Sequence, residues 1–150
     1  MSTNFFNINW CHINMKHIRV LRKSTRKLEE LSFLDAPGGT GNTFVTILLL
    51  ANIRKQSKIA IAVACHSTLL SGCHTAYSAL KLPLNLSKSE NPLSNIKKAT
   101  ETANVLQQCL TIVWDECTMS HKLTFKALDR SLQDILDNNM LMGGVTGVIW

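Results

Sequence analysis

Hydrophobic positions along the chain follow two recurring patterns. Short apolar runs, typical of strands in a parallel sheet, occupy residues 31–34, 58–64, 110–114 and 145–150. Apolar residues at helical spacing predict helices at residues 43–54, 74–80, 103–108 and 122–136. Because these strands and helices alternate, the sequence predicts an α/β fold in three layers, with a mostly parallel sheet covered by helices on both faces.

The pattern also predicts how two helices are buried. In the helix at residues 43–54, the apolar positions leave most of the surface buried, as expected for a helix packed on a sheet: Phe44, Ile47, Leu48, Leu50 and Ala51. In the amphipathic helix at residues 122–136, the positions expected to be buried are Leu123, Ala127, Leu128, Leu132 and Leu136. Residues 83–100 are polar and predict a long surface loop, and the run at residues 145–150 is expected to leave an exposed edge strand.

A glycine-rich loop is predicted between the first strand and the first helix. Residues 36–43 read APGGTGNT, close to the phosphate-loop pattern of Gly, four residues, Gly-Lys and then Ser or Thr. In such a loop, backbone N–H groups and the start of the helix hold phosphate, and the last hydroxyl binds Mg²⁺. The alternative is a glycine-rich turn without a ligand. The predicted phosphate-binding residues are Gly38, Gly39, Thr40, Gly41, Asn42 and Thr43, with Thr43 also at the metal.

Position 42 departs from this pattern in a way that changes the chemistry. Asn42 stands where the pattern has Lys, and it is short and uncharged. A hydrogen bond to a charged group contributes ~1.5–3 kcal/mol, and the contribution grows where charge moves in the transition state. We therefore expect Asn42 to impair hydrolysis of a bound nucleotide.

A second motif lies at the end of the strand at residues 110–114, which runs into Asp115 and Glu116. In phosphate-loop motors, the Asp holds Mg²⁺ and the Glu positions the attacking water. An acidic strand end is also common in α/β proteins that bind nothing there. The two motifs together, each after a strand, are more specific than either alone, and they predict Asp115 as a metal residue and Glu116 as catalytic.

Three stretches of the sequence resemble the Pif-type DNA helicases, which are RecD-like members of superfamily one. They read FLDAPGGTG at residues 33–41, TA and SALKLPL at residues 75–76 and 78–84, and IVWDECTM at residues 112–119. Weaker matches are ALDR at residues 127–130, LQD at residues 132–134 and LMGG at residues 141–144. The resemblance covers residues 31–150 and is closest to the branch associated with Helitron transposons.

This resemblance implies a RecA-like phosphate-loop fold that uses ATP and Mg²⁺ to drive 5′ to 3′ unwinding of single-stranded or forked DNA. It also implies a truncated motor, because the γ-phosphate sensor and the second motor domain of relatives would follow residue 150. Roles in DNA repair, recombination and the DNA damage response are expected in the nucleus, with the mitochondrion or cytoplasm as alternatives. The alternative function is a non-catalytic helicase remnant that retains nucleotide or DNA binding.

Composition adds a few limits to this picture. The net charge of +6 suits a partner with phosphates, and basic residues crowd the first thirty positions. We expect residues 1–30 to be a poorly ordered basic segment, and residues 31–150 to form the partial motor domain. No apolar run approaches the ~20 residues that cross a bilayer.

Cysteine and tryptophan positions carry little further chemistry. Five cysteines at irregular spacing do not form a disulfide framework, which favours a reducing compartment. The pairs Cys65-His66 and Cys73-His74 fit no usual zinc spacing. Trp114 is expected in the sheet core rather than stacked on a base.

Overall fold

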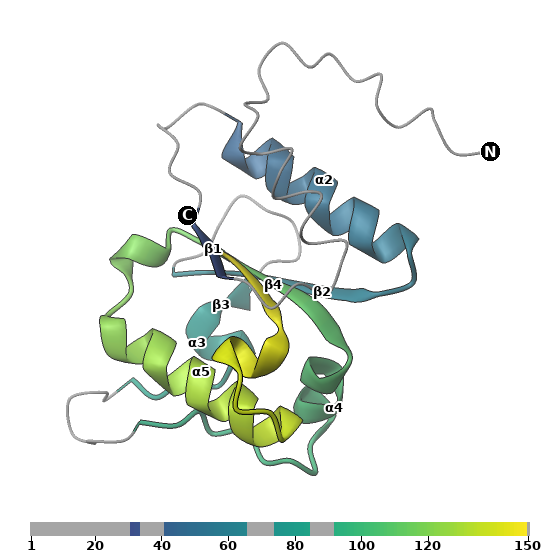
Figure 1. Cartoon of the computed structure of the whole chain (residues 1–150). Coiled ribbons are helices and arrows are strands. Elements are labelled where there is room, and N and C mark those ends of the chain that lie inside the picture. The colour runs from purple at the N-terminus through teal and green to yellow at the C-terminus, as the bar shows by residue number, and fades with distance from the viewer. Residues whose placement is uncertain (1–30, 34–40, 66–73, 85–91, 150) are drawn as a thin grey trace.

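The computed structural model describes residues 31–33, 41–65, 74–84 and 92–149 (Figure 1). Its strands are β1 (Leu31–Phe33), β2 (Ile59–Ala64), β3 (His74–Thr75), β4 (Cys109–Asp115) and β5 (Thr146–Ile149). Its α-helices are α2 (Asn42–Lys55), α3 (Ala76–Ala79), α4 (Glu101–Gln107) and α5 (Lys122–Leu136). Short 3₁₀ turns, η4 (Cys117–Met119) and η5 (Leu141–Gly144), follow β4 and α5. The predicted segment at residues 1–30 lies outside the described residues.

The strands form one parallel sheet in the order β1-β5-β4-β2-β3. At the carboxyl ends, Ala64 of β2 lies in register with Asp115 of β4, and Trp114 lies in register with Ile149 of β5. Parallel strands bring all their carboxyl ends to the same edge of a sheet. That edge therefore receives the described residues that follow β2 and β4, including the pair Asp115-Glu116.

Helices cover both faces of the sheet, as the sequence predicts. Helix α2 lies on one face, and α3, α4 and α5 lie on the other (Figure 1). The core beneath α2 consists of Val45, Leu49, Leu50, Ile53, Ala60, Leu110, Val113 and Val148. A larger core on the opposite face is built around Val63, Leu80, Leu106, Ile112, Trp114, Leu128 and Leu132. The predicted three-layer α/β fold is confirmed.

Two predictions about strands are wrong. The helix predicted at residues 74–80 begins only at Ala76, because His74 and Thr75 pair with β2 as a short fifth strand. Thr75 then caps α3, its hydroxyl accepting a hydrogen bond from the N–H of Ser78 at 3.2 Å. The run at residues 145–150 does not form an exposed edge, since β5 lies between β1 and β4 and Val148 is fully buried.

The buried face of α2 also differs from the prediction. Phe44 and Ile47 are 44% and 50% exposed, and Ala51 is exposed as well. Leu50 is buried as predicted, and the other buried residues are Val45, Thr46, Leu49 and Ile53. Apolar residues surround this helix, so their spacing does not indicate which side meets the sheet. Thr46 is tolerated in the core because its hydroxyl donates to the carbonyl of Asn42 at 3.0 Å.

Helix α5 has the predicted bounds and a partly different buried face. Ala127, Leu128 and Leu132 are buried as expected, whereas Leu123 and Leu136 are half-buried. The burial of Thr124, Ser131 and Ile135 was not predicted.

A hydrogen-bonded serine explains one of the buried polar positions of α5. The hydroxyl of Ser131 donates to the carbonyl of Ala127 at 2.6 Å and accepts from the N–H of Ser94 at 2.7 Å. The second bond fastens the described part of the predicted loop, residues 92–100, to α5.

Candidate functional site

The carboxyl edge of the sheet brings the start of α2 and the end of β4 to the same side of the molecule (Figure 1). Helix α2 follows β1, and Asp115 is the last residue of β4. Strand β5 lies between β1 and β4, so the two strand ends are separated by about two strand spacings, roughly 10 Å.

The described end of the glycine-rich loop is the start of α2. Gly41 takes a left-handed backbone conformation (φ 89°, ψ 23°) at the N-cap of the helix, and its carbonyl accepts from the N–H of Val45 at 3.0 Å. It offers no side chain to cap the helix, and the first turn contains no acidic residue. The positive end of the helix dipole therefore meets this edge, which favours an anion.

The predicted phosphate-binding residues are only partly described. Gly38, Gly39 and Thr40 lie outside the described residues, so their predicted roles stay predictions. Asn42 is half-buried as the first residue of α2, and Thr43 is exposed beside it. The structure thus places the last two predicted residues at the positive end of a 14-residue helix.

The second motif has a specific backbone geometry. Asp115 is half-buried, while Glu116 is exposed and adopts a left-handed conformation (φ 54°, ψ 37°). The N–H of Glu116 donates to Oδ1 of Asp115 at 3.0 Å. This bond holds the Asp115 carboxylate against the backbone of the next residue and leaves the Glu116 carboxylate at the surface.

The donor set at this edge suits Mg²⁺ better than a metal that prefers protein ligands. The described residues contain no cluster of three or more His, Cys, Asp or Glu that could hold a metal ion. Mg²⁺ usually keeps several waters and takes one or two carboxylates together with phosphate oxygens. The carboxylate of Asp115 and the hydroxyl of Thr43 are oxygen ligands of the kind that Mg²⁺ prefers. For a zinc site, His66 and Cys73 lie outside the described residues.

Trp114 serves the core, as predicted. It is 1% exposed and its ring lies 4.5 Å from that of Phe125, at an interplanar angle of 34°. Its indole N–H has no hydrogen-bond partner within the described part of the chain. The tryptophan next to the acidic motif is therefore unavailable to stack on a base.

Sequence reasoning missed a thiol–hydroxyl pair beside Glu116. The thiol of Cys65 donates to the carbonyl of Glu116 at 3.1 Å, and its sulfur lies 2.6 Å from Oγ of Ser120. Burial, helped by nearby Cys65 and Asp115, raises the pKa of Cys117 in the same loop. No signal in the sequence pointed to this pair, because only the pairing of β2 with β4 brings Cys65 next to Glu116.

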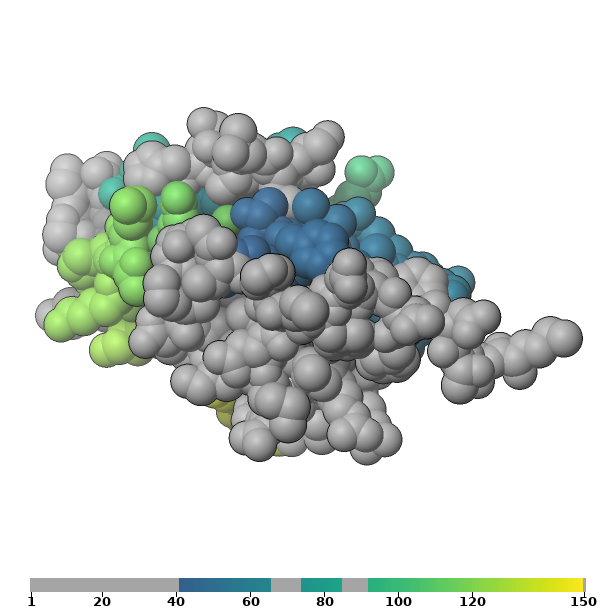
Figure 2. All heavy atoms as spheres, turned by 90° about the horizontal axis from the view of Figure 1, so that it is seen from above, coloured from purple at the N-terminus to yellow at the C-terminus, as the bar shows by residue number. Residues whose placement is uncertain are grey.

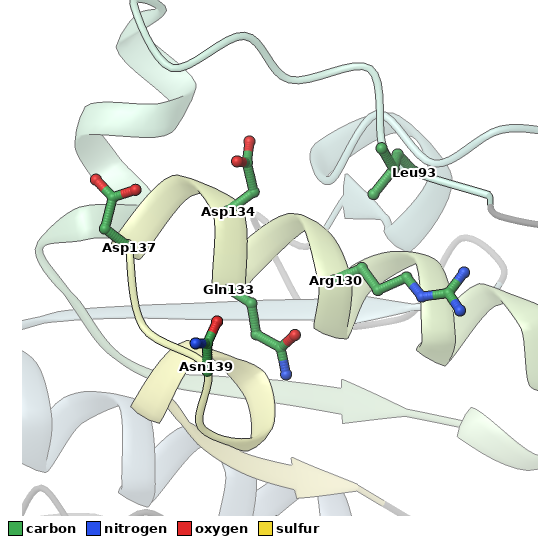
Figure 3. A pocket seen from close by; sticks show the side chains of 6 residues that line it. All are labelled: Leu93, Arg130, Gln133, Asp134, Asp137 and Asn139. Carbon is green, nitrogen blue, oxygen red and sulfur yellow. The ribbon is translucent and has the colours of Figure 1, made fainter.

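A pocket elsewhere on the molecule does not belong to this site. It is an open hollow of about 610 Å³ along the C-terminal half of α5 (Figure 3), lined by Leu93, Arg130, Gln133, Asp134, Asp137 and Asn139. Nζ of Lys98 lies 2.8 Å from Oδ1 of Asp137 and 3.3 Å from Oδ1 of Asp134, and the bond to Asp137 raises the pKa of that lysine. Mixed charges of this kind do not select a phosphate.

The described surface near the start of α2 is partly visible from above the sheet (Figure 2), where α2 forms part of the exposed face. Phe44 and Ile47 contribute exposed apolar area to this helix. No helix in the described ranges is long and apolar enough to cross a membrane.

Comparison with known proteins gives one family and one fold. The model of the PIF1-like helicase family matches residues 15–150. A search of curated proteins finds no match. Among solved structures, the Pif1 helicase from Candida albicans is 18% identical with a TM-score of 0.75, over 91% of this chain and 32% of that chain.

Two Bacteroides structures show the same likeness. Pif1 in complex with ADP-AlF4 is 19% identical with a TM-score of 0.72, over 91% of this chain and 31% of that chain. Pif1 bound to ssDNA is 20% identical with a TM-score of 0.70, with the same coverage of both chains. The chain thus spans about a third of the length of these structures, and the likeness shows a shared fold.

Proposed function

Because the chain belongs to the PIF1-like helicase family, we propose that it is the nucleotide-binding part of a DNA helicase motor. It binds ATP with Mg²⁺ at the carboxyl edge of its sheet. The observation that carries this proposal is that the start of α2 and the pair Asp115-Glu116 lie on the same side of the molecule, at the carboxyl edge of the sheet (Figure 1).

Each residue at this edge has a role that its position supports. Backbone N–H groups of the glycine-rich loop and the first turn of α2 bind the phosphates. The hydroxyl of Thr43 and the carboxylate of Asp115, through water, hold Mg²⁺, which neutralises charge on the phosphate oxygens. Glu116 orients the attacking water, a role that its exposed carboxylate allows.

In this proposal, Asn42 lowers the rate at which the bound nucleotide is hydrolysed. It is the first residue of α2 and occupies the place of the phosphate-binding lysine. Without that charge, hydrolysis slows more than binding, because charge moves in the transition state. This observation also favours a second candidate function, a non-catalytic helicase remnant that retains nucleotide or DNA binding.

The proposed macromolecular partner is DNA, single-stranded or forked. Solved relatives are described as bound to ssDNA and as unwinding forked dsDNA. The net charge of +6 is compatible with such a partner. We further propose 5′ to 3′ unwinding, kinship with the Helitron-associated branch of superfamily one, and a nuclear role in DNA repair or recombination. These finer points follow from the sequence resemblance.

The Mg²⁺ dependence of nucleotide binding tests the proposed site. Affinity for a fluorescent ATP analogue is measured with Mg²⁺ and with EDTA, in the native chain and in Asn42→Lys. Asp115→Asn should remove most of the Mg²⁺ enhancement, whereas Asp137→Asn, which changes an exposed carboxylate at the C-cap of α5, should not. An unchanged Mg²⁺ enhancement in folded Asp115→Asn would place the metal elsewhere.

A further inference from the structure

The backbone of Glu116 is held in a conformation that its residue type disfavours. Its φ of 54° and ψ of 37° lie in the left-handed region, where a side chain crowds the following carbonyl. In that conformation its N–H reaches Oδ1 of Asp115 at 3.0 Å. The orientation of both acidic residues thus depends on the contacts that keep the backbone of Glu116 in this conformation.

Cys65, the residue after β2, contacts the backbone carbonyl of Glu116. Ala64 is in register with Asp115, so the next residue of each strand leaves the sheet side by side. The thiol of Cys65 donates to the carbonyl of Glu116 at 3.1 Å. That carbonyl also accepts from the N–H of Met119 at 3.1 Å.

A second hydroxyl completes the contact. Oγ of Ser120 lies 2.6 Å from the sulfur of Cys65. Because the thiol has a single proton and gives it to Glu116, the hydroxyl of Ser120 donates to the sulfur. The bonds form one chain, from Ser120 through Cys65 to the carbonyl of Glu116, and it ties both ends of the loop after β4 to the end of β2. Such chains strengthen each member by polarisation.

We infer that Cys65 is a positioning residue for the acidic motif, with Ser120 as its support. The thiol fixes the carbonyl of Glu116 and so helps to hold the left-handed φ and ψ of that residue. Its N–H, on the other side of the same Cα, then stays directed at Asp115, and the two carboxylates keep their separate directions. This inference rests on the proposed function, since it assigns the acidic pair a task in binding Mg²⁺ and orienting water.

Four variants separate positioning from simple packing. Cys65→Ala removes the donor, and Cys65→Ser keeps a donor of smaller size. Cys109→Ala deletes a thiol of the same sheet at the start of β4, six residues and about 20 Å from Asp115. Ser120→Ala removes only the supporting hydroxyl.

Hydrogen exchange tests the chain of bonds from Ser120 through Cys65 to Glu116, here called the clamp, without any ligand. In the full chain, the N–H groups of Glu116, Met119 and Ser120 are bonded to acceptors within or next to the loop. Cys65→Ala should accelerate their exchange about tenfold, Ser120→Ala should do so less, and Cys65→Ser should restore slow exchange. Equal exchange in Cys65→Ala and Cys109→Ala, or no restoration by Cys65→Ser, would overturn the clamp.

Mg²⁺-dependent nucleotide binding then tests the consequence for the site. With a fluorescent ATP analogue in the Asn42→Lys background, Cys65→Ala should lower the Mg²⁺ enhancement of affinity about threefold to tenfold. Affinity in EDTA should not change, and Cys65→Ser should behave like the parent chain. An unchanged Mg²⁺ enhancement, despite faster exchange, would overturn the positioning role. If no chain binds nucleotide while exchange responds as expected, the clamp is real and the proposed function fails.

Discussion

The carboxylate of Asp129 accepts a hydrogen bond of 2.6 Å from the backbone N–H of Met142. This bond joins α5 to the η5 turn that leads into β5. Gln133 extends the link, because its amide donates to Asp129 at 3.2 Å and to the carbonyl of Met140 at 3.2 Å. The turn leads into β5, which lies between β1 and β4, so this network joins α5 to the strand at the centre of the candidate site.

Removal of the Asp129 carboxylate should destabilise the fold. Asp129→Ala leaves the N–H of Met142 without its charged acceptor, which should lower the free energy of unfolding by about 2 kcal/mol. Urea denaturation measures the change. Asp134→Ala, which loses only a surface ion pair with Lys98, should change it by less than about 1 kcal/mol. Similar losses in both variants would contradict the role of the network.

Replacement of Gly143 in the same turn should lower the free energy of unfolding. Its φ is 63°, and an added Cβ would lie 2.7 Å from the carbonyl oxygen of Leu132 and 2.6 Å from Cδ1 of Leu136. Gly143→Ala should therefore cost about 2–4 kcal/mol from backbone strain and clash combined. Gly41→Ala is the matched control, because its φ is 89° but nothing lies within 4 Å of an added Cβ. Thermal denaturation should show that Gly41→Ala costs about 1 kcal/mol, and equal costs would contradict the clash.

The buried thiol of Cys109 should give the fold a specific alkaline sensitivity. Burial raises the pKa of Cys109 from 9.0 to about 11. The unfolded chain therefore loses this proton first as the pH rises, so this contribution to stability falls between pH 9 and 11, by about 2–3 kcal/mol. Denaturation at several pH values measures the slope. Cys109→Ala should flatten it relative to the native chain, and an identical slope in both would show that the thiol does not cause it.

The sequence predicts most of the helices and strands because their apolar spacing is regular. Helix α5 has the predicted bounds, and β2, β4 and β5 lie where the apolar runs are. The buried face of α2 could not be predicted, since apolar residues surround that helix. Its contact side depends on how it lies on the sheet, which local spacing does not encode.

The order of the strands in the sheet could not be predicted from the sequence either. The strand at the end of the sequence lies inside the sheet, and His74-Thr75 forms a strand too short to leave an apolar pattern. Local patterns identify a strand but do not identify its neighbours.

At the candidate site, the chemical motifs were readable and the supporting contacts were not. Asp115 and Glu116 were predicted because an apolar strand ends in two acids. The thiol of Cys65 lies 51 residues away in sequence from Glu116, and only pairing between β2 and β4 brings the two together. Contacts of that kind appear once the sheet register is known.

The most direct test of the account is the affinity of the native chain and of Asn42→Lys for a fluorescent ATP analogue with Mg²⁺, with circular dichroism to establish that both are folded. Asn42→Lys should bind the analogue at least about tenfold more tightly than the native chain, because the substitution restores a charge-assisted bond to phosphate. Equal affinity would contradict the role given to position 42. Absence of binding by folded Asn42→Lys would contradict the nucleotide site itself.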